Sequence, residues 1–304
     1  MKKVLVIGPT MLDVNVRLGK VGKYRPQTSY SIGGKGYNVA HTLGLFNVPT
    51  VLATMYGQDE IGSYLKECIQ KNGIEVLPTN KVNHPSSIFV GVHDDAGETV
   101  FDKADTDIFD KQKLPNINYK NVSMILIVSS TASYILNHLR VVKIKNPEIL
   151  FGLEISGSKT IEHIFPYLDI FTFLICNKKE AERLGEVMDM HGNLERIMQG
   201  LLERGMQEVI FTTDRDGLIG GKLENKVPVF YRSSVQKVPG NIISTVGAGD
   251  SVTAAFMASF YCFHKEFKES IDIAMRVAAI SVRTKDPFPK KLPQRLIKAV
   301  TIKI

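Results

Sequence analysis

Short apolar runs recur along the chain and alternate with longer amphipathic stretches. Runs of strand length that are apolar throughout, instead of at every second position, are typical of strands buried on both faces of a sheet. Such runs lie at residues 4–7, 50–55, 124–128, 149–153, 170–175 and 209–211. Because helical stretches separate them, the pattern predicts a doubly wound α/β fold, in which helices cover both faces of a mostly parallel sheet.

The helices between these strands are bounded largely by glycine. Glycine commonly follows the last residue of a helix because it adopts the left-handed backbone conformation without strain. We expect helices at residues 37–46, 60–72, 178–184, 193–204 and 248–263. The first begins after Gly36, and the next three end at Gly73, Gly185 and Gly205.

Two segments depart from this rhythm and resemble half-exposed antiparallel strands. Residues 13–17 are expected to pair with 28–32, and residues 87–92 with 98–102 through a turn at 94–97. They predict a small separate sheet, a candidate lid; an edge extension of the main sheet is the alternative. Without a repeat or an obvious linker, we expect one domain over residues 1–304, with lid strands at about 13–32 and 87–103.

Composition excludes several classes of protein. A chain with 44% hydrophobic and 23% charged residues is not extensively disordered. The longest uncharged apolar stretch, residues 251–263, is shorter than the roughly 20 residues that a membrane helix needs. The amino terminus lacks the pattern of a signal peptide, and the three cysteines have no metal-ligand spacing. We therefore expect a cytoplasmic protein without a membrane partner.

The positive charge is concentrated at one end of the chain. Residues 276–304 contain eight basic residues and one acidic residue, a surplus equal to the whole formal net charge of +7. No basic motif there is interleaved with aromatic residues that could stack on bases, so a solvated C-terminal helix is the preferred interpretation and a nucleic-acid partner is not expected.

The strongest chemical signal is the segment Ser244-Thr245-Val246-Gly247-Ala248-Gly249-Asp250-Ser251, which precedes an apolar helix. Two glycines around an alanine leave backbone N–H groups uncovered at a helix N-terminus, where partial positive charge favours anions. Asp250 could serve only as a favourable acidic residue of the first helical turn. Beside an anion site, its carboxylate could instead accept a proton from a hydroxyl during phosphoryl transfer.

Two further motifs lie upstream, Gly33-Gly34-Lys35-Gly36-Tyr37-Asn38 and Asn177-Lys178-Lys179-Glu180. With the Asp250 segment they resemble, in the same order, the motifs of the PfkB-type, ribokinase-like carbohydrate kinases. The resemblance implies a three-layer α/β/α Rossmann-like core with a small β-sheet lid. It also implies ATP-dependent phosphorylation of a hydroxyl, usually a CH₂OH, of a sugar or nucleoside, with Mg²⁺ as cofactor. Residues 87–108 faintly resemble the pseudouridine kinase branch.

The resemblance also assigns roles to individual residues. It makes Asp250 the catalytic base and the amides of Gly247, Ala248 and Gly249 the anion hole. It places Asp13, Gly34, Lys35 and Asn38 on the acceptor side, with Asp105 as a secondary candidate. It places Asn177, Glu180, Thr212, Gly217 and Thr245 on the nucleotide side, where Asn177 and Glu180 would position Mg²⁺ through water. A helix cap and a surface acid are the alternative roles of this last pair. A homodimer through the lid is a further expectation.

Three of the departures from the family pattern bear on function. Met11 replaces an asparagine that binds the sugar, which argues against free ribose as acceptor. Ser244 replaces an aspartate tied to monovalent-cation binding, which weakens the case for activation by such a cation. Asp214 replaces the first glycine of a nucleotide loop and is expected to crowd a phosphate. These departures motivate the alternative of a non-catalytic sugar or nucleotide sensor on the kinase scaffold. No Walker P-loop or dinucleotide fingerprint is present.

Overall fold

The computed structural model describes residues 2–19, 27–77, 83–95, 99–105, 108, 117–128, 133–157 and 160–301. A nine-stranded main sheet has the order β13-β12-β11-β10-β9-β8-β1-β4-β5. Its strands are β1 (Lys3–Ile7), β4 (Thr50–Ala53), β5 (Glu75–Val76), β8 (Val122–Val128), β9 (Leu150–Glu154), β10 (Phe173–Asn177), β11 (Glu208–Thr212), β12 (Leu218–Glu224) and β13 (Val227–Ser233). All pairings from β5 to β11 are parallel, whereas β12 and β13 add an antiparallel edge.

The six apolar runs therefore are the parallel core of the sheet, as the pattern predicts. One boundary is wrong: the run at 170–175 begins in the 3₁₀ helix η3 (Phe165–Ile170), and β10 starts only at Phe173. An apolar run does not separate a strand from a buried helical turn that precedes it.

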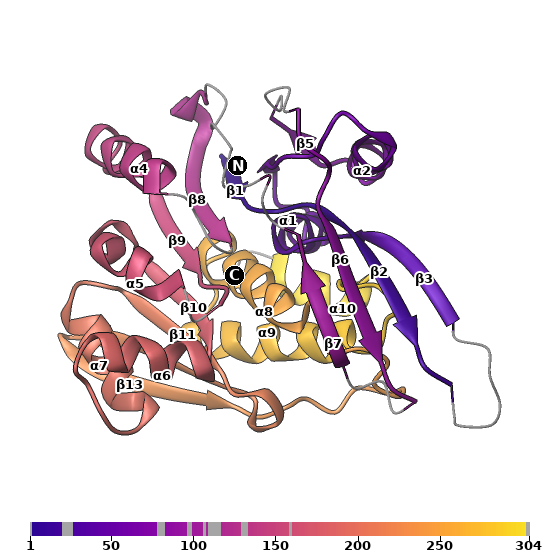
Figure 1. Ribbon diagram of the computed structural model, residues 1–304. Helices are drawn as coiled ribbons and strands as arrows, with labels where there is room; N and C mark the ends of the chain where they lie inside the picture. Colours follow the sequence, from indigo (N-terminus) through magenta and orange to yellow (C-terminus); the bar gives the residue numbers. More distant parts are fainter. Residues whose placement is uncertain are drawn as a thin grey trace.

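Helices form a layer on each face of the main sheet (Figure 1). One layer contains α1 (Lys35–Leu45), α2 (Glu60–Lys71), α8 (Ala248–Phe256), α9 (Phe267–Ser281) and α10 (Gln294–Thr301). The other contains α4 (Ser133–Lys145), α5 (Ile161–Ile164), α6 (Lys178–Val187) and α7 (Leu194–Glu203). Side chains of β1 alternate between them: Val4 and Val6 pack in the first cluster, Leu5 and Ile7 in the second.

The helix predictions hold with three corrections. Gly36 does not precede the first helix, because α1 begins at Lys35 and contains it. Gly185 does not end α6, which continues to Val187; the glycine instead faces Ile197 of the adjacent α7. The helix expected to 263 is α-helical only to Phe256 and continues as a π-helix, η5 (Met257–Cys262). In α10, Leu296 and Val300 are buried, so the C-terminal helix is solvated on one side only.

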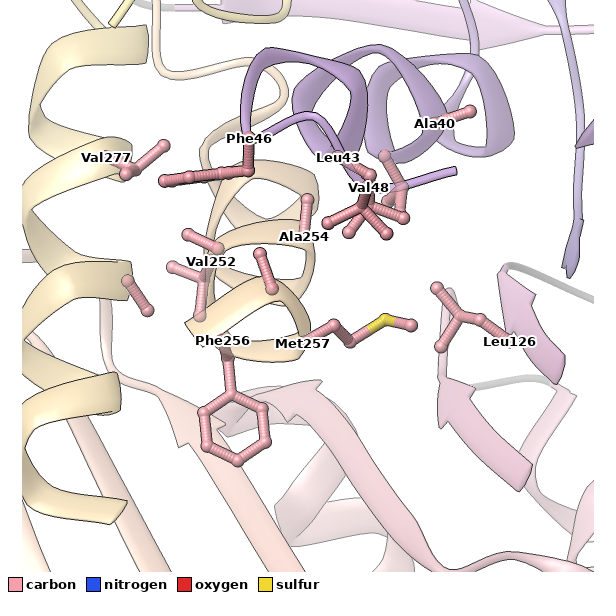
Figure 2. Close-up of a cluster of buried hydrophobic side chains, with 14 of the residues drawn as sticks. Ala40, Leu43, Phe46, Val48, Leu126, Val252, Ala254, Phe256, Met257 and Val277 are labelled. Atoms are coloured by element: carbon pink, nitrogen blue, oxygen red, sulfur yellow. The ribbon is translucent and has the colours of Figure 1, made fainter. Parts of the chain in front are cut away.

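Packing of α8 against its neighbours holds two distant parts of the chain together. Figure 2 shows Val252 and Ala254 of α8 between α1, which contributes Leu43, and α9, which contributes Val277, while Phe256 points toward the strands of the sheet. All five side chains are buried. Fully burying such side chains stabilises a protein by about 1.5–3 kcal/mol each. This packing fixes the position of the start of α1 relative to the start of α8, and two of the motifs lie at these helix starts.

A second, four-stranded sheet has the order β3-β2-β6-β7 and lies beside the main sheet (Figure 1). It consists of β2 (Met11–Arg17), β3 (Gln27–Gly33), β6 (Ile88–His93) and β7 (Thr99–Ala104). Both antiparallel pairs are as predicted, and β2 and β6 join them in parallel. The alternative of an edge extension is wrong. Of the expected turn at 94–97, residues 96 and 97 lie outside the described part of the chain.

A buried acidic residue at the start of β11 makes unfolding sensitive to pH. Glu208 accepts a hydrogen bond from the Tyr261 hydroxyl and lies opposite Lys222 of β12. Burial raises the pKa of Glu208 to about 7, although the Tyr261 hydrogen bond and the Lys222 charge oppose this. The folded protein therefore keeps a proton that the unfolded chain, with an ordinary pKa of about 4.5, has released.

We expect the free energy of unfolding to fall as pH rises from about 4.5 to about 7, by on the order of 3 kcal/mol from this residue. Urea unfolding of the wild type and of Glu208→Gln across this range would measure the effect. The variant should lose that part of the pH dependence. Two identical pH profiles would contradict the prediction.

No helix in the described part of the chain is long and apolar enough to cross a membrane.

Candidate functional site

The site is built where the start of α1 meets the start of α8. Asp250, the third residue of α8, is buried, with 3% of its surface exposed. Asn38 Nδ2 donates a hydrogen bond of 2.7 Å to Asp250 Oδ2, and Lys35 Nζ lies 3.3 Å from Asp250 Oδ1. Two predicted residues of the first motif therefore meet the carboxylate of Asp250, which lies more than 200 positions later in the chain.

A second carboxylate contacts the same lysine. Glu154, the last residue of β9, is also 3% exposed, and its Oε1 lies 3.1 Å from Lys35 Nζ. Burial raises the pKa of Glu154 to about 7, and the charge of Asp250 adds to this, while Lys35 acts in the opposite direction. Glu154 was not among the residues predicted from the sequence. Its signal is a lone acidic residue at the carboxyl end of a strand expected to be buried, the edge at which parallel sheets place ligands.

Lys35 remains an ammonium ion in this surrounding. Burial lowers the pKa of its amine, but the charges of Asp250 and Glu154 more than compensate and raise the pKa well above its usual value. The lysine side chain is about a third exposed, at 36%, whereas both carboxylate side chains are 4% exposed. One positive charge with access to solvent thus stands between two buried acids.

Asp13 of β2 forms the side of the site next to the small sheet. Burial raises its pKa to about 8, and the nearby charge of Asp250 adds to this. The carboxyl group occupies the space beside Gly33, where a Cβ atom would lie 2.1 Å from Asp13 Oδ2. The glycine that ends β3 is therefore required so that Asp13 can lie against the backbone.

Replacing Gly33 by Ala is expected to displace the Asp13 carboxyl group from this position. Because the obstacle is the end of a side chain and not backbone, the fold should persist, with a loss in the ordinary range of about 0.5–3 kcal/mol. If Asp13 holds the acceptor, KM for the acceptor should rise at least tenfold while KM for the nucleotide stays near that of the wild type. Steady-state kinetics with each substrate varied in turn would show this, and an unchanged KM for the acceptor would contradict it.

The segment at the start of α8, where the sequence predicts an anion site, leaves two of the three predicted amides without an acceptor in the described chain. Gly247 caps the helix in the left-handed conformation at φ 77°. In the described part of the chain the amides of Gly247 and Gly249 have no hydrogen-bond acceptor, but the Ala248 amide donates to the Thr245 carbonyl at 3.3 Å. Ser244 accepts a hydrogen bond from the Val246 amide through its hydroxyl, so it shapes the turn. A helix of this length leaves its first amides available to an anion.

Asn177 and Glu180 form both halves of a capping box at the start of α6. Asn177 Oδ1 accepts the Glu180 amide at 2.9 Å, and Glu180 Oε2 accepts the Asn177 amide at 2.9 Å. Glu180 Oε1 accepts the amide of Gly157 at 2.7 Å. Glu180 is buried, so it is not the surface acid of the alternative interpretation. Its charge reaches the site, because it contributes to the raised pKa of Lys35.

The other predicted nucleotide residues lie at the end of β11 and before α8. Thr212 ends β11, and Gly217 follows the short 3₁₀ helix η4 (Asp214–Asp216). Asp214, which replaces a glycine of the family pattern, has a positive φ of 50° and is exposed. Aspartate tolerates this conformation better than most residues, so the loop keeps a glycine-like backbone. Thr245 is exposed in the turn before Gly247.

Asp105 lies just beyond β7, and its amide donates to the carbonyl of Ile88 in β6. Since Ile88 is opposite Leu12 in β2, Asp105 is at the end of the small sheet that also carries Asp13. Its side chain is exposed. In the described chain, no group of three or more His, Cys, Asp or Glu side chains is arranged to hold a metal ion by itself.

Comparison with known proteins identifies similar sequences. The model of the family described as pfkB family carbohydrate kinase matches residues 1–294. A 1-phosphofructokinase of Borreliella burgdorferi is 28% identical, over 78% of this chain and 76% of its own. A ribokinase of Dictyostelium discoideum is 24% identical, over 94% and 97%.

Solved structures share the fold. Ribokinase from Thermotoga maritima superimposes with a TM-score of 0.75 at 18% identity and covers 99% of both chains. Ribokinase from Cryptococcus neoformans in complex with ADP gives 0.77 at 17% identity, over 98% of this chain and 99% of its own.

Proposed function

Because this chain belongs to the pfkB family of carbohydrate kinases, we propose that it transfers the γ-phosphoryl group of ATP to a hydroxyl, usually a CH₂OH, of a sugar or nucleoside. The observation that carries the proposal is the position of Asp250. Its buried carboxylate accepts a hydrogen bond from Asn38 and pairs with Lys35. At the start of the same helix, the amides of Gly247 and Gly249 have no hydrogen-bond acceptor within the described chain. A base and an anion site side by side are what phosphoryl transfer to an alcohol requires.

In the proposed reaction, Asp250 accepts the proton of the acceptor hydroxyl while the hydroxyl oxygen attacks the γ-phosphorus. The new O–P bond forms, the bond from the γ-phosphorus to the bridging oxygen breaks, and ADP leaves. The amides of Gly247 and Gly249 donate hydrogen bonds to the phosphoryl oxygens, on which charge is concentrated. Asn38 fixes the direction of the Asp250 carboxylate, so the base is oriented before the acceptor arrives.

The nucleotide side can accommodate Mg²⁺. Each Glu180 oxygen accepts one backbone amide and has a second lone pair available, and a buried carboxylate suits a hard cation that retains several of its waters. Glu180 and Asn177 would hold the ion through water. When bound, Mg²⁺ neutralises charge on the nucleotide phosphates. Thr212, Gly217 and Thr245 would line the remainder of the nucleotide site.

On the acceptor side, we place Asp13, Gly34 and Lys35, with Asp105 at the rim. The pKa of about 8 means that Asp13 holds its proton at neutral pH, so it can donate a hydrogen bond to an acceptor oxygen as well as accept one. Met11 is buried beside Gly33 and offers only apolar contact at that position. The small sheet would close over the acceptor and exclude water as a competing nucleophile.

The direct test measures ADP production with Mg·ATP across a panel of pentoses, hexoses, hexose phosphates, adenosine and pseudouridine. One acceptor should support turnover well above the rate without acceptor. If none does, while ligands still raise the melting temperature, the protein binds its ligands without catalysis and the proposal fails.

The small sheet also offers a surface to a second copy of the chain. Its register places Asp13 on one face and Val14, Tyr30, Val92 and Phe101 on the other. Tyr30 is 69% exposed and Phe101 is 54% exposed. We expect a homodimer through this face, detected as a doubled mass by light scattering. Phe101→Lys should shift the protein to the monomer, and a monomeric wild type would refute the dimer.

A further inference from the structure

Glu154 lies on one of the rigid elements of the site. It ends β9 in the centre of the main sheet, where it is paired with Val128 of β8 and with Ile175 of β10. The residue is 3% exposed, and Thr253 of α8 interacts with its carboxylate and acts to lower its pKa. A carboxylate on so rigid an element is a suitable anchor for a neighbouring cation.

Lys35, by contrast, is held only by its charges. Its Nζ lies at nearly equal distances from Glu154 Oε1, 3.1 Å, and from Asp250 Oδ1, 3.3 Å. With Asp250 as its only partner, the ammonium would be drawn fully to that carboxylate, because two opposite charges at about 4 Å attract by several kcal/mol near a protein surface. A carboxylate so paired has fewer oxygen lone pairs free for the acceptor hydroxyl.

We propose that Glu154 is the positioning residue of the site: it shares the Lys35 ammonium with Asp250, and so keeps Asp250 Oδ1 available to the acceptor hydroxyl and keeps Lys35 directed toward the reacting groups. This inference rests on the proposed kinase reaction. Glu154 touches neither substrate in it and acts only through Lys35.

The charged groups near Glu154 and Lys35 come from several elements of the fold. Lys35 faces Glu154 from α1, and Asp250 faces both from α8. Asp13 from β2 interacts with Asp250, and Glu180 from α6 adds negative charge near Lys35. Removing the charge of Glu154 therefore leaves Lys35 paired with Asp250 alone. The Asp250 carboxylate is then less available to the acceptor hydroxyl.

The test compares Glu154→Gln with Glu208→Gln, which removes a buried carboxylate of similarly raised pKa at the start of β11, away from the site. At pH 8, where Glu154 is ionised, kcat of Glu154→Gln should fall about tenfold, with KM for ATP unchanged. In Glu208→Gln both kcat and KM should stay near those of the wild type. A kcat that does not fall in Glu154→Gln would overturn the proposal.

A second measurement does not depend on turnover. Melting temperatures at pH 8 are compared for Lys35→Met, Glu154→Gln and the double variant. If Glu154 holds Lys35, Lys35→Met leaves a buried carboxylate without its partner, and adding Glu154→Gln should recover part of the lost melting temperature. Losses that simply add would overturn the proposal. The cycle of Lys35→Met with Glu208→Gln should be additive. A wild type without kinase activity would refute the proposed function alone, since this cycle still decides the role of Glu154.

Discussion

Replacing Asp250 by Asn is expected to lower kcat by about 10²–10⁴-fold, the usual contribution of a general base. The amide is nearly isosteric with the carboxylate and can still pair with Asn38, so the packing at the start of α8 should be preserved. What is lost is the ability to accept the acceptor's proton. The nucleotide contacts proposed at the amides of Gly247 and Gly249 do not involve this side chain.

Turnover should be measured by steady-state kinetics and ATP affinity by titration calorimetry. The prediction is a large fall in kcat with a change of less than a few-fold in Kd for ATP. Glu208→Gln is the control for loss of a buried acidic group and should retain turnover. An Asp250→Asn variant that retains the full rate would remove Asp250 from the chemistry.

The second large effect is expected for Gly247→Ala. Gly247 has a φ of 77°, a conformation that costs an L-residue about 1–2 kcal/mol. Its Cβ would also lie 1.8 Å from the carbonyl oxygen of Pro287, a backbone atom that cannot turn aside as a side chain can. The variant must therefore shift either the turn before α8 or the segment around Pro287. Both the free energy of unfolding and kcat should fall, kcat by about 10²-fold or more as donors leave the anion site.

Gly249→Ala is the matched control, two residues further along the same segment. Nothing lies within 4 Å of a Cβ atom placed there, so this variant should unfold like the wild type. We place the phosphate of the nucleotide in this open space, so KM for ATP should rise. Chemical denaturation and steady-state kinetics of the two variants would separate the roles. Equal stability of Gly247→Ala and Gly249→Ala would contradict the assignment of Gly247 as a conformational requirement.

The local pattern of the sequence determined a large part of this protein. Fully apolar runs predict the parallel core of the main sheet, because a strand covered on both faces has no solvent side on which polar residues could alternate. The glycine-rich segments before α1 and α8 predict where the chain presents backbone amides, and the order of the motifs predicts the family. Each of these signals depends on neighbours within a few residues.

Only the tertiary structure decided how these parts act on one another. Glu154 is one acidic residue among many in the sequence, and its role arises because β9 ends beside Lys35 of α1, 119 positions away. The raised pKa of Asp13 likewise comes from burial and from Asp250, and the need for glycine at position 33 comes from the Asp13 carboxyl group on the adjacent strand. Desolvation and charge interactions depend on distance in space, and that distance is set by the packing of helices on the sheet, which local sequence does not contain.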